Sequence, residues 1–105
     1  MERRLRRSER PGEAVRLYLE ALRARTGMDG VALANEDGLL VAGAGENLDW
    51  LAAVGASSTR STVQCGDRTV HVRRMRVHSE DVCLASTGVL TNDEAARSIS
   101  RIFAA

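Results

Sequence analysis

Residues 22–42, LRARTGMDGVALANEDGLLVA, decide the fold, because a helix end, two short strands and the turn between them follow one another there without a spare residue. Arg23 and Arg25 are cations that suit the C-terminus of a helix. Gly27 follows them and can take the left-handed backbone conformation that closes a last helical turn. The segment therefore begins with the end of a helix.

Two apolar runs of strand length come next, at residues 31–34 and 39–42. The tetrapeptide between them is Asn35-Glu36-Asp37-Gly38. An Asp-Gly pair between apolar runs is a strong hairpin signal, since glycine tolerates the positive φ that such a turn needs. The sequence thus predicts a helix that leads directly into a β-hairpin.

Composition limits the chain to one small domain. It has 105 residues, of which 44% are hydrophobic and only 3% aromatic, so the core must consist mainly of Leu, Val, Ile and Ala. The formal charge of +1 gives no overall nucleic-acid footprint. No apolar run approaches the roughly 20 residues of a membrane span, and no secretory signal is evident. We expect a cytoplasmic protein.

The N-terminus differs from the rest in composition. Residues 1–10 contain five arginines and two glutamates and show no clear apolar face. We expect residues 1–12 to form a flexible arginine-rich tail and residues 13–105 a single domain. A solvated extension of the first helix and contact with an acidic partner remain the alternatives. Pro11 suits the first turn of a helix and is costly deep inside one.

A second helix is expected at residues 48–59, after a break in the strand at Gly43-Ala44-Gly45 and with Asn47 as its N-cap. Trp50, Leu51 and Val54 are large, whereas most of its other residues are Ala, Gly or Ser. Small side chains allow another backbone to come close, so this helix is suited to tight packing.

Three further strands are expected at residues 62–65, 69–77 and 82–85, the first two joined by a turn at Gly66-Asp67-Arg68. The apolar residues of the middle strand change parity at Arg73-Arg74, which predicts a β-bulge there. A capping box at residues 91–94 then begins a last helix. The apolar stripe of this helix consists of Ala95, Ile99, Ile102 and Phe103.

This order of elements, with GVAL at residues 30–33 and DGLLVA at residues 37–42, resembles the roadblock family of dynein-light-chain-like proteins, which have profilin-like, longin-related folds. The resemblance covers roughly residues 13–103. It implies an α+β fold with a five-stranded antiparallel sheet of order 2-1-5-4-3, the first and third helices on one face and the second on the other. It also implies dimerisation through the second helix and third strand, and binding of small Ras-like GTPases. The family's central helix is usually longer than the second helix here.

The residues themselves agree with a dimer. The expected third strand, residues 62–65, would be a sheet edge without proline, lysine or any charge, and such an edge can pair with another chain. We therefore predict a two-fold homodimer, with the first hairpin in the half of the sheet far from the interface. Its predicted interface residues are Trp50, Leu51, Val54, Gly55, Ser58, Thr62, Val63 and Gln64.

Catalytic motifs are absent from the sequence: there is no GxSxG, no phosphate loop and no HExxH. His71 and His78 have opposite strand parity, which disfavours a joint metal site. We predict a protein that is not an enzyme and binds no cofactor or metal. Arg60 and Arg68 are candidate contacts to a GTPase, where an arginine acting in trans can accelerate hydrolysis.

Two other classes of function stay open. A small-molecule-sensing module of the profilin-like or PAS-like kind is the alternative, although the sequence shows few aromatic or convergent polar groups for a ligand. Nucleic-acid binding lacks the aromatic platforms that single strands need. Cys65 and Cys83 belong to no CxxC pair and are expected to be reduced, on strands either side of a third.

Overall fold

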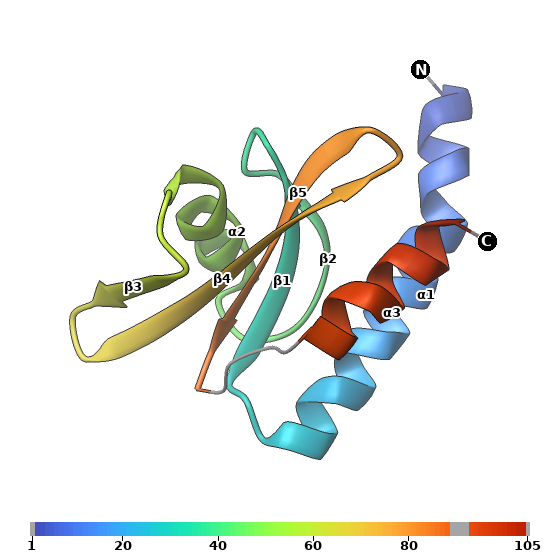
Figure 1. Ribbon diagram of the computed structural model, residues 1–105. Helices are drawn as coiled ribbons and strands as arrows, with labels where there is room; N and C mark the ends of the chain where they lie inside the picture. Colours follow the sequence, from blue (N-terminus) through green and yellow to red (C-terminus); the bar gives the residue numbers. More distant parts are fainter. Residues whose placement is uncertain (1, 89–92, 105) are drawn as a thin grey trace.

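The computed structural model describes the backbone of residues 2–88 and 93–104, and the side chains of residues 12–88 and 94–104. It contains three helices and five strands within these ranges (Figure 1). In chain order they are α1 (Glu2–Thr26), β1 (Gly30–Asn35), β2 (Leu40–Gly45), α2 (Leu48–Ser57), β3 (Thr62–Cys65), β4 (Arg68–Val77), β5 (Glu80–Thr87) and α3 (Asp93–Ala104).

The helix end and first hairpin predicted from residues 22–42 are confirmed. Gly27 has φ 75° and its N–H donates to the carbonyl of Arg23 at 2.8 Å, which closes the last turn of α1. In the hairpin turn, Oδ1 of Asn35 accepts hydrogen bonds from the backbone N–H groups of Asp37 and Leu39, both at 3.0 Å. Gly38 has φ 84°, the positive value that the turn requires.

The strands form one antiparallel sheet in the order β2-β1-β5-β4-β3, as the resemblance implied. Helices α1 and α3 pack on one face and α2 lies on the other (Figure 1). Strands β2 and β3 are the two edges, and the β3–β4 hairpin extends away from the α1/α3 layer. None of the helices within the described residues has the length and apolar character needed to cross a bilayer.

Each face of the sheet has its own hydrophobic core. The core under α1 and α3 is built largely from big side chains: Val15, Leu19, Leu22, Met28, Val31, Leu33, Leu84 and Ile99 belong to it. The core under α2 is built largely from small ones: Ala32, Ala34, Leu51, Ala52, Val70, Val72, Cys83 and Ala85. Alternate residues of β1 and β5 enter the two cores, because successive side chains of a strand point to opposite faces.

The predicted bulge in β4 is wrong. Strand β4 pairs with β5 without a shift of register, from Val70 opposite Thr87 to Val77 opposite Glu80. Val70 and Val72 belong to the core under α2, whereas Val77 belongs to the core under α1 and α3. The parity changes because the apolar side chains at the start of β4 point into the core under α2, whereas those at its end point into the core under α1 and α3. The sheet has a register shift elsewhere, between β1 and β2 at Leu33/Ala34.

Strand β2 also differs from the prediction, because Gly43-Ala44-Gly45 continues the strand instead of breaking it. A Cβ on Gly43 would lie 3.0 Å from both Cδ1 of Leu48 and the carbonyl oxygen of Val31. Glycine at this position lets the start of α2 cross close to the strand.

The helix boundaries were only partly predicted. Helix α1 begins at Glu2 and contains Pro11, which corresponds to the extended helix that the sequence left open. The division into a flexible tail at 1–12 and a domain at 13–105 stays a prediction. Asn47 is the N-cap residue of α2, as predicted, and its carbonyl oxygen accepts a hydrogen bond from the N–H of Leu51 at 2.9 Å, but its φ is 58° and its side chain makes no capping hydrogen bond. The capping box expected at 91–94 falls partly outside the described residues, since 91 and 92 are not described.

Candidate interaction surfaces

The inner face of α2 lies directly on the sheet. The side chain of Leu51 is fully buried, and a Cβ built on Gly55 would lie 3.0 Å from Sγ of Cys83 and 3.1 Å from Cβ of Ala85. Both residues were expected at a dimer interface. Their burial within the protomer corrects that expectation, because neither can face a partner while α2 stays on the sheet.

A cation holds the C-terminal half of α2 in place. The guanidinium of Arg74 donates to the carbonyl oxygen of Gly55 at 3.3 Å, and a positive charge suits the carbonyls at this end of a helix. The pKa of the Cys83 thiol beneath is raised, chiefly because burial disfavours the thiolate, although Arg74 and a backbone hydrogen bond from Ala34 act in the opposite direction. Cys83 is thus a buried neutral thiol.

The outer face of α2 presents a different set of side chains. Trp50 is 38% exposed, and Ala53 and Ser57, three and seven positions later, are also exposed. Val54 is half-buried and packs against the core under α2. Tryptophan is enriched at surfaces that bind other proteins, and the small side chains beside it leave room for a partner's backbone to come close.

Strand β3 continues this surface to the edge of the sheet. Thr62 and Gln64 are exposed, and Val63 is half-buried against the core under α2. Gln64 is already engaged, since its Nε2 donates to the carbonyl of Gly66 at 2.9 Å and its Oε1 accepts from Thr69 Oγ1 at 2.8 Å. The strand pairs with β4 on one side, and no described strand pairs with its other side.

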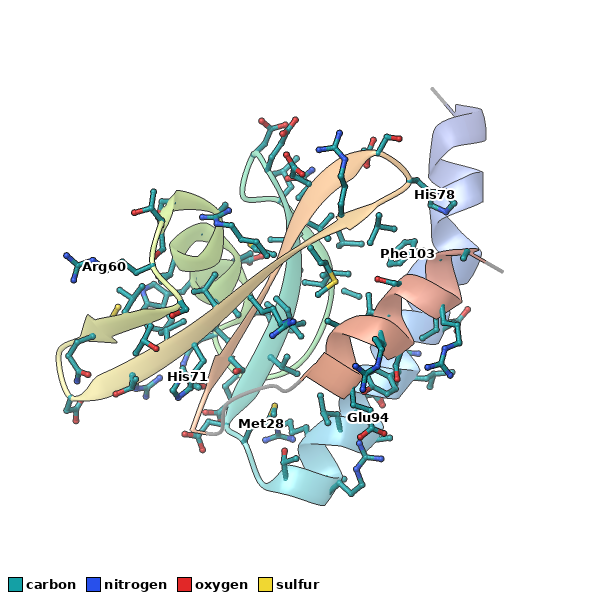
Figure 2. The ribbon with its side chains drawn as sticks, viewed as in Figure 1. Met28, Arg60, His71, His78, Glu94 and Phe103 are labelled. Atoms are coloured by element: carbon teal, nitrogen blue, oxygen red, sulfur yellow. The ribbon has the colours of Figure 1, made fainter. Side chains whose placement is uncertain are left out.

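Two exposed arginines flank β3. Arg60 follows α2, and its backbone N–H donates to Oγ of the half-buried Ser58 at 3.1 Å (Figure 2). Arg68 begins β4, directly after the turn that contains Gly66. The two candidate GTPase contacts therefore lie at opposite ends of the same edge strand.

The position of the first hairpin corrects one expectation. A Cβ on Gly38 would lie 3.5 Å from Cβ of Ala56 and 3.8 Å from Cα of Ala53. The turn of the β1–β2 hairpin therefore sits next to the C-terminal half of α2. It was expected to lie far from the interface, but it abuts the helix that carries the predicted interface.

The histidines do not come together. His71 lies in β4 opposite Ser86 of β5, and its buried Nδ1 has no hydrogen-bond partner among the described residues. His78 lies in the β4–β5 turn, where Nε2 contacts the carbonyl oxygen of Phe103 and the two rings meet edge to face at 6.3 Å (Figure 2). The residues that the structure describes contain no group of three His, Cys, Asp or Glu placed to hold a metal ion.

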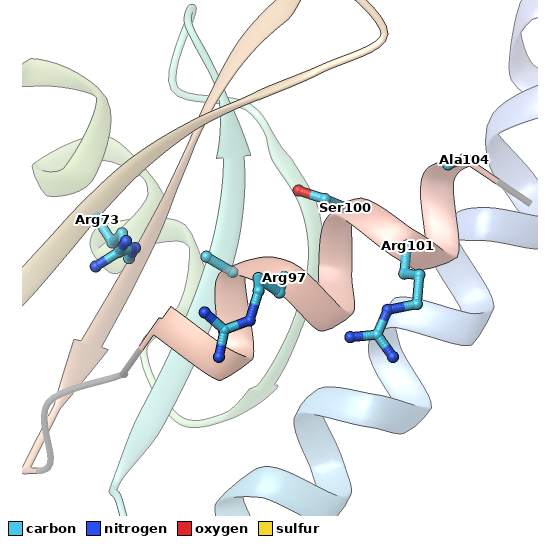
Figure 3. Close-up of a pocket in the computed structure, with 6 residues that line it drawn as sticks. Arg73, Arg97, Ser100, Arg101 and Ala104 are labelled. Atoms are coloured by element: carbon cyan, nitrogen blue, oxygen red, sulfur yellow. The ribbon is translucent and has the colours of Figure 1, made fainter.

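Sequence reasoning missed a second surface, on the opposite side of the sheet. A shallow hollow of about 670 Å³ lies between β4 and α3 (Figure 3). It is lined by Arg73, Ala96, Arg97, Ser100, Arg101 and Ala104. The spacing of Arg97 and Arg101 could have shown that they share one face of a helix, but only the fold places Arg73 opposite them.

Comparison with known proteins supports the architecture. No protein-family model and no curated protein matches the sequence. Among solved structures, the chain is similar to MglB of Myxococcus xanthus, a roadblock/longin-domain protein, with a TM-score of 0.63 and 14% identity over 89% of this chain and 90% of that chain. The chain has a roadblock-type, longin-like fold. The resemblance drawn from the first hairpin and the order of elements is confirmed at the level of the fold.

Proposed function

We propose that this protein is a homodimeric roadblock-type regulator or scaffold that binds a small Ras-like GTPase in the cytoplasm. The observation that carries the proposal is the roadblock-type fold, which extends over nearly the whole chain. The role of GTPase binding comes from the family resemblance. The exposed surface formed by α2 and β3 supports the dimer part of the proposal, and the exposed Arg60 and Arg68 beside it are the proposed GTPase contacts.

The dimer would form through the outer face of α2 and the edge of β3. Pairing of two β3 strands across a two-fold axis would satisfy the backbone groups of both edges and join the sheets. Trp50 of each copy would then be buried against the other α2 helix. The aromatic side chain carries most of the apolar surface available there, so we expect it to contribute most of the binding energy.

Sedimentation velocity tests this arrangement. We expect the wild-type chain to sediment as a dimer at micromolar concentration, and a Trp50→Ala/Gln64→Lys variant to sediment as a monomer with unchanged circular dichroism. Leu40→Lys, at a 38% exposed position on the opposite edge strand β2, is the matched control and should remain a dimer. A monomeric wild type, or a dimer disrupted only by Leu40→Lys, would contradict the proposal.

The GTPase contact is assigned to Arg60 and Arg68, at the ends of β3. The purified protein, used as bait in a lysate of its own cells, should retain a small GTPase. An Arg60→Ala/Arg68→Ala variant should retain less of it. GTP hydrolysis then separates two roles. Faster hydrolysis with wild type but not with the variant identifies an activator that supplies an arginine, whereas unchanged hydrolysis identifies a scaffold.

The small-molecule-sensing function remains the alternative. The hollow between β4 and α3 is open and lined by arginine, alanine and serine, with no aromatic side chain among its lining residues. This lining does not favour a metabolite site, because such sites are usually concave and largely apolar. A metabolite that co-purifies with the protein in native mass spectrometry would replace the GTPase proposal with this one.

A further inference from the structure

The arginine hollow, defined by the six residues given above, brings together cations from two elements. Arg97 and Arg101 lie one turn apart on α3, and Arg73 approaches from β4 (Figure 3). The rise of a helix separates positions four residues apart by about 6 Å. The positive charge is therefore spread along a turn of helix and across to a strand, and does not converge on a single point.

Arg97 and Arg101 differ from other arginines in their partners. In α1, Arg16 forms ion pairs with Glu13 and Glu20. In the β4–β5 hairpin, a guanidinium nitrogen of Arg76 lies 3.2 Å from a carboxylate oxygen of Asp81. Within the described part of the chain, neither Arg97 nor Arg101 forms a hydrogen bond or ion pair, and both are exposed. Like charges four residues apart on a helix repel each other, so the fold carries a small cost that an anion would offset.

The chain as a whole carries little net charge, with a formal value of only +1. A local cluster of arginines on a nearly neutral chain favours a localised anionic partner over general binding of polyanions.

We propose that the arginine hollow binds an acidic segment of a partner protein, with carboxylates spaced by one helical turn. Such carboxylates match the spacing of Arg97 and Arg101, and each can accept two parallel N–H···O bonds from a guanidinium. Ser100 also lines the hollow and adds a hydroxyl. The lining has no aromatic side chain on which a nucleic-acid base could stack and no large apolar side chain that could enter a membrane.

This surface is separate from the proposed dimer face. Arg73 and α3 lie on the side of the sheet covered by α1 and α3, whereas α2 covers the other side. A dimer formed through α2 and β3 would leave both arginine hollows open. The acidic segment could then be bound with or without a GTPase, and failure of either proposal would leave the other intact.

Fluorescence anisotropy tests the proposal with a labelled alanine-based helical peptide that carries glutamate pairs one turn apart, against the same peptide with glutamine. The full chain should bind the glutamate peptide and release it as salt is raised. An Arg97→Glu/Arg101→Glu variant should bind at least about tenfold more weakly, since each arginine is replaced by a repelling charge. Arg73→Gln should weaken binding by a smaller factor.

The matched control is Arg60→Glu/Arg68→Glu, which changes the net charge equally at the other end of the molecule and should leave peptide affinity within about twofold. Arg97→Gln/Arg101→Gln, which keeps good helix formers in α3, serves if the charge-reversed variant fails to fold. Equal losses in both charge-reversed variants would overturn the proposal. So would equal binding of both peptides, or tighter binding of single-stranded DNA or phosphatidylserine vesicles that is lost on the same substitutions.

Discussion

The two faces of the sheet are packed with side chains of different size. On β1, Val31 and Leu33 point toward α1 and α3, whereas Ala32 and Ala34 point toward α2. Strand β5 repeats the contrast, with Leu84 on the first face and Ala85 on the second. Large residues hold two helices away from the sheet, and small residues allow a single helix to lie close to it.

This difference shows how each face is stabilised and what each leaves exposed. The α1/α3 face derives its stability from the burial of large apolar side chains, and the arginine hollow lies at the border between its helix α3 and strand β4. The α2 face depends on close approach, with Gly55 against Cys83 and Ala85. The largest side chain of this helix, Trp50, is left on its outer side, where it is 38% exposed.

Removal of a large side chain from the α1/α3 face should have the largest effect. Leu84 is fully buried there, and Leu84→Ala is expected to lower the free energy of unfolding by about 2–5 kcal/mol, because it leaves a cavity in the core. Urea denaturation measures the change. Leu39→Ala, at a 64% exposed position, is the control and should stay within about 0.5 kcal/mol of wild type. Similar losses of unfolding free energy in both variants would contradict the view that buried large side chains stabilise this face.

Addition of a methyl group should be costly on the α2 face. A Cβ at Gly55 lies 3.0 Å from Sγ of Cys83, so Gly55→Ala should cost about 1 kcal/mol, because overpacking exceeds the gain in helix propensity. The same substitution in a Cys83→Ala background should be neutral or stabilising, since the sulfur is gone. A double-mutant cycle from urea denaturation measures this coupling. If the changes in unfolding free energy of the two substitutions were additive, α2 could move away from the sheet without loss of stability, and the close approach would not matter.

The smallest expected effect concerns pH. Burial raises the pKa of the Cys83 thiol above its ordinary value of 9.0, so the unfolded chain releases this proton at lower pH than the folded chain does. The resulting stability is present below that ordinary value and is lost as pH rises through it toward the folded pKa. Denaturation curves from pH 8 to pH 10 should therefore show a smaller decline for Cys83→Ala than for wild type. Cys65→Ser, on the half-buried edge strand, should decline as wild type does; equal slopes for all three would exclude the effect.

Local chemistry explains which parts of the structure were predictable. The Gly27 helix end and the Asn35 turn depend on neighbours within a few residues, so their sequence signals were sufficient. The parity change in β4 was misinterpreted because a bulge and a strand shared by two cores give the same sequence pattern. The inner side of α2 was misassigned for a similar reason, since small and large residues occur around the whole helix and only the contact with Cys83 shows which side is buried.

The sequence by itself determined the order of elements, the first hairpin and the composition of an edge strand that can pair, because these follow from backbone preference and periodicity along the chain. Only the tertiary structure decided that Leu51 and Gly55 face inward while Trp50 faces outward, and that Arg73 lines the same hollow as Arg97 and Arg101. The physical reason is that burial and charge proximity depend on contacts between residues distant in sequence. Strand β4, for example, contacts α2 on one face and α3 on the other only in the folded protein.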